Sequence, residues 1–497
     1  MKDNKIDIVY TFYSEEDLVN YLTNSNNLLI NKELNIGNSN HSIIISFEFN
    51  LFKLLKKLRI CITYINKYKL QLDYNIIFHN ITFQRGVIFN SCIFNYDIKF
   101  IQSIFESNEN IVFEEVIANG SLSFIASRFN NVGIYFRKMK CIKKFSVISS
   151  QFISNNSLEI EDFVASKIEF NTVTFDIEVN FIRINFKSIK FDNSTLLRKM
   201  ELYSDNCNNK IIFLKTDFID NVKIYGQDKY NKFLSISLSY LYANIHSKMI
   251  LENLKIYTLN LKGTNIVGNF SRINCKIKYI KNWHTARILK HEEYKKSNHI
   301  KALKYQSEET RLYKEKLYTN KKWYKNLKNI GDIISIELSS LYSCNGQNWI
   351  ESFVYTILFP ILFFTLSYNL SCISIFIFTF IHFIISIRIL SNNKSRKKYA
   401  FIYISIYILI YIIASYFYFK YYDSSNIKYI KDLFSFLIPT NFSQILYNNN
   451  CNISYIYNSN NIIEIVVKGT FYFIGKIAFW YGSVQTVQAF RKFSKGT

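Results

Sequence analysis

The sequence predicts a β-solenoid N-terminal domain, a helical linker and an α-helical transmembrane bundle of about four spans. Two patterns predict this architecture: phenylalanines that recur every eleven residues, and long apolar runs near the C-terminus. A chain of 497 residues has room for more than one domain. We expect a leading segment or cap at 1–74, the solenoid at 75–280, a basic linker at 281–345 and the transmembrane domain at 346–497.

The composition is rich in Asn, Ile, Lys, Tyr and Phe, with only 2 prolines and 13 glycines. A genome poor in G and C favours such codons, so part of the net charge of +24 reflects coding bias. Many of the basic residues cluster beside the apolar C-terminal runs, which indicates orientation in a membrane rather than nucleic-acid binding. We therefore expect a lipid bilayer as partner and no nucleic acid.

The repeat sets six phenylalanines alternately five and six residues apart: Phe78, Phe83, Phe89, Phe94, Phe100 and Phe105. An eleven-residue period can also indicate a right-handed helical coil. Here apolar residues alternate locally, as at Ile76 and Phe78, and Asn and Ser separate them, which favours strands and turns. Short strands bury an apolar face only when they stack, so the phenylalanines should form a ladder inside a degenerate solenoid. Core packing accounts for them.

The leading segment leaves several structures open. Leu51–Lys69, which begins LFKLLKKLRI, fits a basic amphipathic helix at a membrane surface, the cap of the solenoid, or its first strands. No apolar run follows Met1, so we expect no secretory signal and a cytoplasmic N-terminal domain. The eight cysteines show neither CxxC pairs nor zinc spacing, and no metal or cofactor is expected.

The linker begins where the composition changes at Trp283. Residues 284–318 are highly charged and contain neither Gly nor Pro, with a partial apolar stripe. This pattern predicts one or two helices that connect the domains, with Thr285 as the N-terminal cap.

The membrane prediction depends on three apolar runs, Trp349–Tyr368, Cys372–Leu390 and Tyr399–Phe419. Each is close to the roughly 20 residues that cross a bilayer core. Val466–Phe490 is a more polar fourth candidate.

Basic clusters at 321–328, 388–398 and 491–495 indicate the cytoplasmic side of the predicted bundle. Four spans place every cluster there, whereas three would leave the basic tail outside. The expected location is the inner (plasma) membrane, multi-pass, with both termini cytoplasmic.

Residues 432–446 are too few to cross a membrane and too apolar for a free loop. Pro439, Thr440 and Asn441 interrupt the segment midway. It fits a re-entrant segment that dips into the membrane, or an amphipathic helix on the outer surface.

The fourth candidate span has two distinct faces. Small residues form a helix-packing seam at Gly475, Ala478 and Gly482. We predict that a second face lines a pore, with Lys468, Tyr472, Lys476, Ser483 and Thr486. Lys476 lies deepest, and a buried ammonium needs either water or a partner such as Glu351 or Glu464.

Three stretches carry a family resemblance: the Phe repeat, Thr285-x-Arg287-x-Leu289-Lys290, and Asn345-Gly346-x-x-Trp349 with the closing Gln485-x-x-Gln488. On these residues the chain resembles pentapeptide-repeat-type bacterial membrane proteins with a C-terminal channel-like transmembrane region. The resemblance implies a cytoplasmic repeat solenoid joined to a pore region. The chain contains no TVGYG-like filter, so the resemblance does not imply potassium selectivity.

The sequence contains no Gly-rich phosphate loop, GxSxG, HExxH or EF-hand pattern, so we do not expect an enzyme. The first functional hypothesis is an oligomeric ion-channel-like pore, formed by several copies of the chain and regulated by a solenoid that senses or binds a protein. The alternative is a membrane-anchored scaffold whose solenoid binds a protein partner, without conduction.

Overall fold

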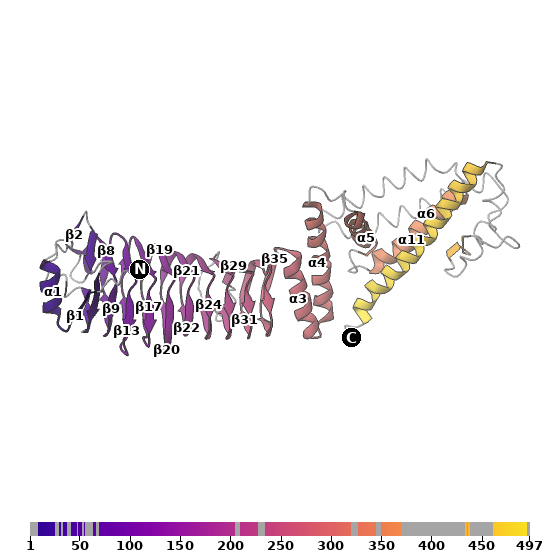
Figure 1. Ribbon diagram of the computed structural model, residues 1–497. Coiled ribbons are helices and arrows are strands. Elements are labelled where there is room, and N and C mark those ends of the chain that lie inside the picture. The colour runs from indigo at the N-terminus through magenta and orange to yellow at the C-terminus, as the bar shows by residue number, and fades with distance from the viewer. Residues whose placement is uncertain are drawn as a thin grey trace, which may run out of the picture. The chain divides into compact units, whose positions relative to one another are not determined.

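The computed structural model describes residues 8–24, 29–30, 33–36, 41–46, 48–51, 54, 63–65, 69–203, 209–226, 234–319, 327–343, 349–368, 433–434, 436–437 and 461–494. The chain divides into two compact units, Met1–Ile288 and Leu289–Thr497. The first is a stack of β-strands and the second is helical (Figure 1).

The first unit contains two sheets whose strands are almost all parallel. Sheet A has 19 strands: β1 (Ile8–Phe12), β4 (His41–Ile45), β5 (Phe49–Asn50), β9 (Ile81–Phe83), β10 (Val87–Asn90), β13 (Ile104–Glu106), β14 (Ile111–Glu114), β17 (Arg128–Asn130), β18 (Ile134–Arg137), β20 (Gln151–Glu161), β22 (Thr174–Ile182), β24 (Thr195–Leu196), β25 (Met200–Tyr203), β27 (Asp217–Phe218), β28 (Val222–Tyr225), β30 (Asn244–Ile245), β31 (Met249–Glu252), β33 (Asn265–Ile266) and β34 (Phe270–Ile273). Sheet B has 16: β2 (Leu29–Ile30), β3 (Glu33–Ile36), β6 (Thr63–Ile65), β7 (Lys69–Leu72), β8 (Asn75–His79), β11 (Cys92–Phe94), β12 (Ile98–Ile101), β15 (Ile117–Ala118), β16 (Ser121–Ile125), β19 (Lys140–Ile148), β21 (Val164–Asn171), β23 (Asn185–Asp192), β26 (Asn209–Leu214), β29 (Leu234–Leu241), β32 (Leu254–Asn260) and β35 (Lys276–Ile280).

These sheets form a β-solenoid of about nine turns over residues 71–280, so the predicted solenoid is confirmed. In the first full coil the chain runs through β8, β9, β10 and β11, and β12 then lies on β8 with Phe100 opposite Phe78. The eleven-residue period is therefore half a coil. The alternating steps of five and six residues lead from each strand of the coil to the next.

The core is a set of aromatic columns parallel to the stacking direction. Phe105 stacks between Phe83 and Phe129, with ring centroids 5.0 and 4.7 Å away and interplanar angles of 12° and 1°. The column continues through Phe152 to Phe175. Parallel coils in register place equivalent side chains directly over one another, so one residue type repeated along the sequence fills the whole interior.

Corners of the coil use a left-handed backbone conformation. At one corner the residues have φ between 48° and 56°: Asn80, Gln102, Ala126, Ser149, Thr172, Asn193, Lys215 and Tyr242. A second series, which includes Ser91, Glu115, Lys138 and Asp162, has φ between 48° and 55°. This conformation costs roughly 1–2 kcal/mol for a residue other than glycine. Each corner amide donates a hydrogen bond to a carbonyl of the next coil, as from Ala126 N to Ile148 O at 2.9 Å, which offsets the cost.

Separate structures close the two ends of the solenoid. At the N-terminal end, helix α1 (Glu15–Asn24) buries Leu18 and Leu22 and lies beside β1 (Figure 1). At the C-terminal end, the Thr285 hydroxyl accepts a hydrogen bond from Leu261 N at 2.8 Å. End caps of this kind satisfy the backbone groups that an open coil would expose.

Helix α3 (Trp283–Lys295) has a different cap from the one predicted. The Asn282 side chain accepts the hydrogen bond from Thr285 N at 2.9 Å, so Asn282 is the N-terminal cap. The prediction of Thr285 was wrong because its hydroxyl bonds to the last coil of the solenoid instead.

The leading segment supplies strands to the solenoid. β4 pairs with β9, and β3 pairs with β8, so coil-like pairing begins before residue 75. Thr63–Ile65 forms β6, antiparallel to β7. Most of Leu51–Lys69 lies outside the described residues, including most of the predicted amphipathic helix.

The second unit contains α4 (His299–Thr319), α5 (Leu327–Ser343), α6 (Trp349–Tyr368) and α11 (Ile462–Ser494). Lys290 of α3 forms an ion pair with Glu309 of α4 at 2.8 Å. Lys314 of α4 pairs with Glu337 of α5 at 3.0 Å. Tyr342, Tyr355, Phe359 and Leu362 form an apolar cluster between α5, α6 and α11.

The predicted four-span transmembrane bundle is wrong: among the described residues, no helix combines the length and apolar character needed to cross a membrane. The first and fourth predicted spans correspond to α6 and most of α11. Charged and polar side chains interrupt both helices, including Glu351 in α6 and Lys468 and Lys476 in α11. Some of their apolar side chains, such as Phe359 and Tyr481, pack in the cluster between the helices. The spans predicted at 372–390 and 399–419 lie outside the described residues.

Candidate functional site

The predicted pore-lining residues of α11 contact other protein groups. Lys468 Nζ lies 2.7 Å from Glu464 Oε1, one turn earlier in the same helix. Tyr472 is buried, and its ring lies 4.9 Å from that of Phe436 at an angle of 74°. Ser483 donates a hydrogen bond back to its own helix, to the carbonyl of Phe479.

Lys476 is completely buried within the helical unit. Its Nζ donates a hydrogen bond to the Phe436 carbonyl and lies 4.9 Å from the centroid of the Phe436 ring and 5.9 Å from that of Tyr472. Burial lowers the pKa of the Lys476 amine to about 8, because the charged form loses its water. The aromatic faces and the carbonyl oxygen provide part of the stabilisation that water would give.

A polar network that the sequence did not reveal joins α5, α6 and α11. The Ser343 hydroxyl donates to Gln485 Oε1 at 2.9 Å. Thr486 Oγ1 lies 3.0 Å from the hydroxyls of both Ser352 and Thr356. The only sequence signal was the spacing of four between Ser352 and Thr356, which places both on one helix face. The network fixes how the helices pack.

The predicted packing seam lies where α11 approaches its neighbours closely. A Cβ at Gly482 would lie 2.5 Å from Thr356 Oγ1, and one at Gly475 would lie 2.8 Å from Phe436 Cζ. The carbonyl of Ala478 accepts a hydrogen bond from the Tyr342 hydroxyl at 3.1 Å. The predicted re-entrant residues Pro439, Thr440 and Asn441 lie outside the described residues.

The solenoid carries an open polar groove of about 750 Å³. We call it the corner groove, because turns that join consecutive strands of sheet A contribute much of it. Its lining residues are Tyr13, Ser46, Gln84, Arg85, Glu106, Ser107, Asn108, Glu109, Asn130 and Asn131. The lining contains side-chain amides, carboxylates, hydroxyls and one guanidinium, so its chemistry is that of hydrogen bonding.

One carboxylate fixes the shape of the corner groove. Glu109 accepts hydrogen bonds from Gly86 N at 2.7 Å and from Arg85 Nη1 at 3.1 Å. Both bonds lower the pKa of the Glu109 carboxyl, and the bond from the Gly86 backbone has the larger effect. Glu109 therefore ties neighbouring coils together, while Tyr13, 77% exposed, and Asn108 remain accessible to a partner.

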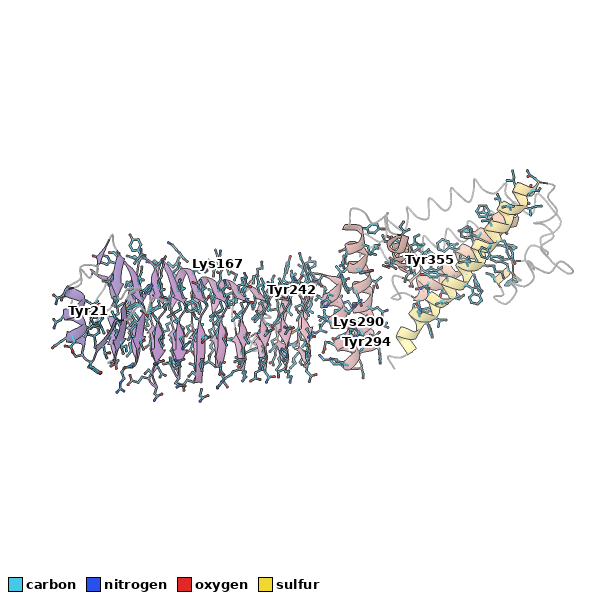
Figure 2. The ribbon with its side chains drawn as sticks, in the orientation of Figure 1. Tyr21, Lys167, Tyr242, Lys290, Tyr294 and Tyr355 are labelled. Carbon is cyan, nitrogen blue, oxygen red and sulfur yellow. The ribbon has the colours of Figure 1, made fainter. Side chains whose placement is uncertain are left out.

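The two sheets differ in charge. From β12 to β35 the strands of sheet B contain the lysines Lys99, Lys140, Lys143, Lys144, Lys167, Lys187, Lys190, Lys210, Lys255, Lys276 and Lys278, all at least partly exposed. The acidic residues of those strands are Glu169 and Asp192. We call this surface the lysine face; Lys167 is labelled on it in Figure 2. The sequence does not reveal this face, because strands of sheet A separate the lysines of one coil from those of the next.

Sheet A has the opposite balance. From β9 to β34 its strands contain the acids Glu106, Glu114, Glu159, Glu161, Asp176, Glu178, Glu201, Asp217 and Glu252. The basic residues are Arg128, Arg137, Lys223 and Arg272. Several form ion pairs between coils, such as Arg137 with Glu159 at 3.3 Å and Lys223 with Glu252 at 3.0 Å.

Cys92 and Cys141 are buried thiols of the solenoid. Across the described ranges, no group of three or more His, Cys, Asp or Glu residues is placed to hold a metal ion. Burial raises the pKa of the Cys92 thiol to about 12 and that of Cys141 to about 11. Both thiols therefore stay protonated and weakly nucleophilic at neutral pH.

Comparison of the chain with protein-family models, with curated proteins and with solved structures gives no match.

Proposed function

We propose that this chain is a protein-binding scaffold, and that an extended segment of a partner protein docks into the corner groove. The corner groove carries this proposal, because it gathers hydrogen-bonding side chains from several coils on one rigid surface. Repeat solenoids bind along extended surfaces of this kind.

The chemistry of the corner groove fits a peptide backbone. Asn108, Asn131 and Gln84 each present both a donor and an acceptor, as does every peptide unit of an extended chain. The Arg85 side chain, 60% exposed despite its bond to Glu109, can also bind an acidic side chain. Hydrogen bonds between coils hold the lining in place before binding, which reduces the entropy lost on docking.

We also infer that the coils are of the pentapeptide-repeat type. Four inward-facing positions per coil, five or six residues apart, support this inference, as at Phe78, Phe83, Phe89 and Phe94. Small hydroxyl residues occupy buried positions two residues before one column: Ser103, Ser127, Ser150, Ser194, Thr216 and Thr264. Their hydroxyls donate to backbone carbonyls, as from Thr264 to Tyr240 O at 2.7 Å. A pore requires the transmembrane bundle, which the described helices do not form.

Selection of a random peptide library on the immobilised full-length protein tests the scaffold proposal. Selected peptides are then measured for affinity by fluorescence anisotropy against two variants. Asn108→Trp places a large ring in the corner groove, whereas Asn265→Trp places the same ring at an exposed position distant along the solenoid. We expect Asn108→Trp to weaken binding at least about tenfold, equivalent to about 1.4 kcal/mol, and Asn265→Trp to change it little.

Two results would contradict the proposal. One is selection of no peptide that binds above background. The other is a set of peptides whose affinity is the same for both variants, which would place binding elsewhere on the chain.

A further inference from the structure

The lysine face has a large excess of positive charge that its own residues do not neutralise. Lys144 pairs with Glu169 at 2.5 Å, and Lys190 pairs with Asp192 at 2.6 Å. Among the described residues, Lys167 and Lys210 have no carboxylate within ion-pair distance.

The strand register places some of these lysines directly opposite one another. Lys144 lies opposite Lys167, and Lys255 lies opposite Lys276, on neighbouring strands. Like charges in directly opposed positions destabilise a sheet. Glu169 offsets part of this repulsion at Lys144, and an anionic partner on this face would reduce it further.

Coding bias cannot explain this distribution. It would add lysines to the outward positions of both sheets, since both are built from the same coils of the same stretch of chain. Yet the strands of sheet A are predominantly acidic, whereas those of sheet B are predominantly basic. The folded coil therefore separates the charges.

Apolar and aromatic side chains are exposed among the lysines. Ile142 is 46% exposed and Val164 39%, in neighbouring strands of sheet B. Further along the solenoid, Tyr257 and Tyr279 are about half exposed, and Lys278 Nζ lies 4.7 and 5.1 Å from their ring centroids. Lysine heads beside tyrosine and aliphatic side chains are typical of surfaces at a membrane–water interface.

We propose that the lysine face docks on the surface of an anionic lipid bilayer, without insertion of a helix. The proposal rests on charge and side-chain type, independently of the corner groove. Lysine is a compact point charge that suits the diffuse field of lipid headgroups. The strands of this face contain no arginine from β12 to β35. Arginine is preferred where a protein binds one phosphate through two hydrogen bonds from the guanidinium group.

Vesicle flotation with the full-length protein tests this proposal. The vesicles are pure phosphatidylcholine, or phosphatidylcholine with about 30% phosphatidylserine, at low and at high salt. Binding should require phosphatidylserine and should weaken at high salt, because salt screens the attraction. The double variant Lys167→Glu/Lys210→Glu should bind at least about tenfold more weakly, since each lysine near such a surface adds appreciable attraction.

The matched control is Arg128→Glu/Lys248→Glu, which makes the same change in net charge at exposed positions on the side of sheet A. It should bind within about twofold of the unmodified protein. Circular dichroism melts check that both double variants fold. If the first one unfolds, Lys167→Gln/Lys210→Gln replaces it, with a smaller loss expected.

Three outcomes would overturn the proposal: equal binding to neutral vesicles, equal losses in the two double variants, or no vesicle binding by a protein that binds polyglutamate or single-stranded DNA through the same lysines. The last result would identify an acidic protein or a nucleic acid as the partner of this face. None of the three affects peptide binding in the corner groove, so the two proposals fail separately.

Discussion

Different kinds of contact stabilise the interior of the solenoid and the interior of the helical unit. In the solenoid, Phe105 stacks on equivalent rings above and below it. In the helical unit the buried contacts are individual, such as Lys476 with the Phe436 carbonyl and Gln485 with Ser343. A repeat spreads stability over many equivalent interfaces, whereas the helical unit depends on particular polar pairs that have no copies.

The largest expected effect sharpens this contrast. Phe105→Ala should destabilise the solenoid by about 3–5 kcal/mol, because it leaves a cavity and removes two stacked contacts. Ile153→Ala, at a 43% exposed position, is the control and should change stability by less than about 0.5 kcal/mol. Chemical denaturation measures both. Equal midpoints for the two variants would show that Phe105 is not in the core.

The second largest loss of stability is expected at a closely packed glycine in a turn of the solenoid. A Cβ at Gly268 would lie 1.7 Å from the Ser247 carbonyl oxygen, so the backbone of two coils would have to separate. Gly268→Ala should cost about 1–3 kcal/mol, measured by thermal denaturation. Asn269→Ala, at the next position, should be nearly neutral. A neutral Gly268→Ala would mean that neighbouring coils are less closely packed than the structure shows.

Raising the pH should affect the two units in opposite directions. In the helical unit, the pKa of Lys476 is lowered from 10.5 to about 8, so between these values the unfolded chain binds more protons and stability rises with pH. In the solenoid, the pKa values of Cys92 and Cys141 are raised from 9.0 by burial, so the unfolded chain loses protons first and stability falls above about pH 9.

Limited proteolysis at pH 7.5 and 9.5, read by mass spectrometry, follows both units in one sample. A model substrate corrects for the pH dependence of the protease. Lys476→Met should remove the gain in the helical unit, and Cys92→Ala/Cys141→Ala should reduce the loss in the solenoid. The same direction of change in both units would contradict this pair of assignments.

The smallest expected effect comes from a glycine of the helical unit. A Cβ at Gly331 in α5 would meet no atom within 4 Å. Gly331→Ala should therefore stabilise α5 by about 0.5–1 kcal/mol, because alanine loses less backbone entropy in a helix. The helical signal in thermal denaturation measures it. Destabilisation by this substitution would reveal a contact at Gly331 and would weaken the contrast with Gly268.

The sequence predicts the solenoid but not the backbone conformation of its corners. The phenylalanine period survives in the sequence because each coil repeats the same side-chain positions. The corners have no such signature: Ala126, Thr172 and Tyr242 adopt the left-handed conformation that favours Gly or Asn. Hydrogen bonds to the next coil stabilise them there, and those bonds exist only after stacking.

The candidate sites were harder to predict than the fold. Segments far apart in the sequence form the corner groove, from Tyr13 to Asn131. The membrane prediction for the segments that form α6 and α11 depends on their apolar content and on the basic clusters of the chain. A hydropathy pattern does not distinguish a side chain that faces lipid from one that packs on another helix, as Tyr355 of α6 packs on Tyr342 of α5.

The sequence by itself determined the coil: a period of eleven, strands of alternating burial, and phenylalanines in columns. These are local, regular features that every coil repeats. Only the tertiary structure decided that lysines gather on sheet B, that acids gather on sheet A, and that the ring of Phe436 lies beside the amine of Lys476. The physical reason is distance along the chain: such neighbours meet only when separate segments pack, and no local pattern encodes which of them will face each other.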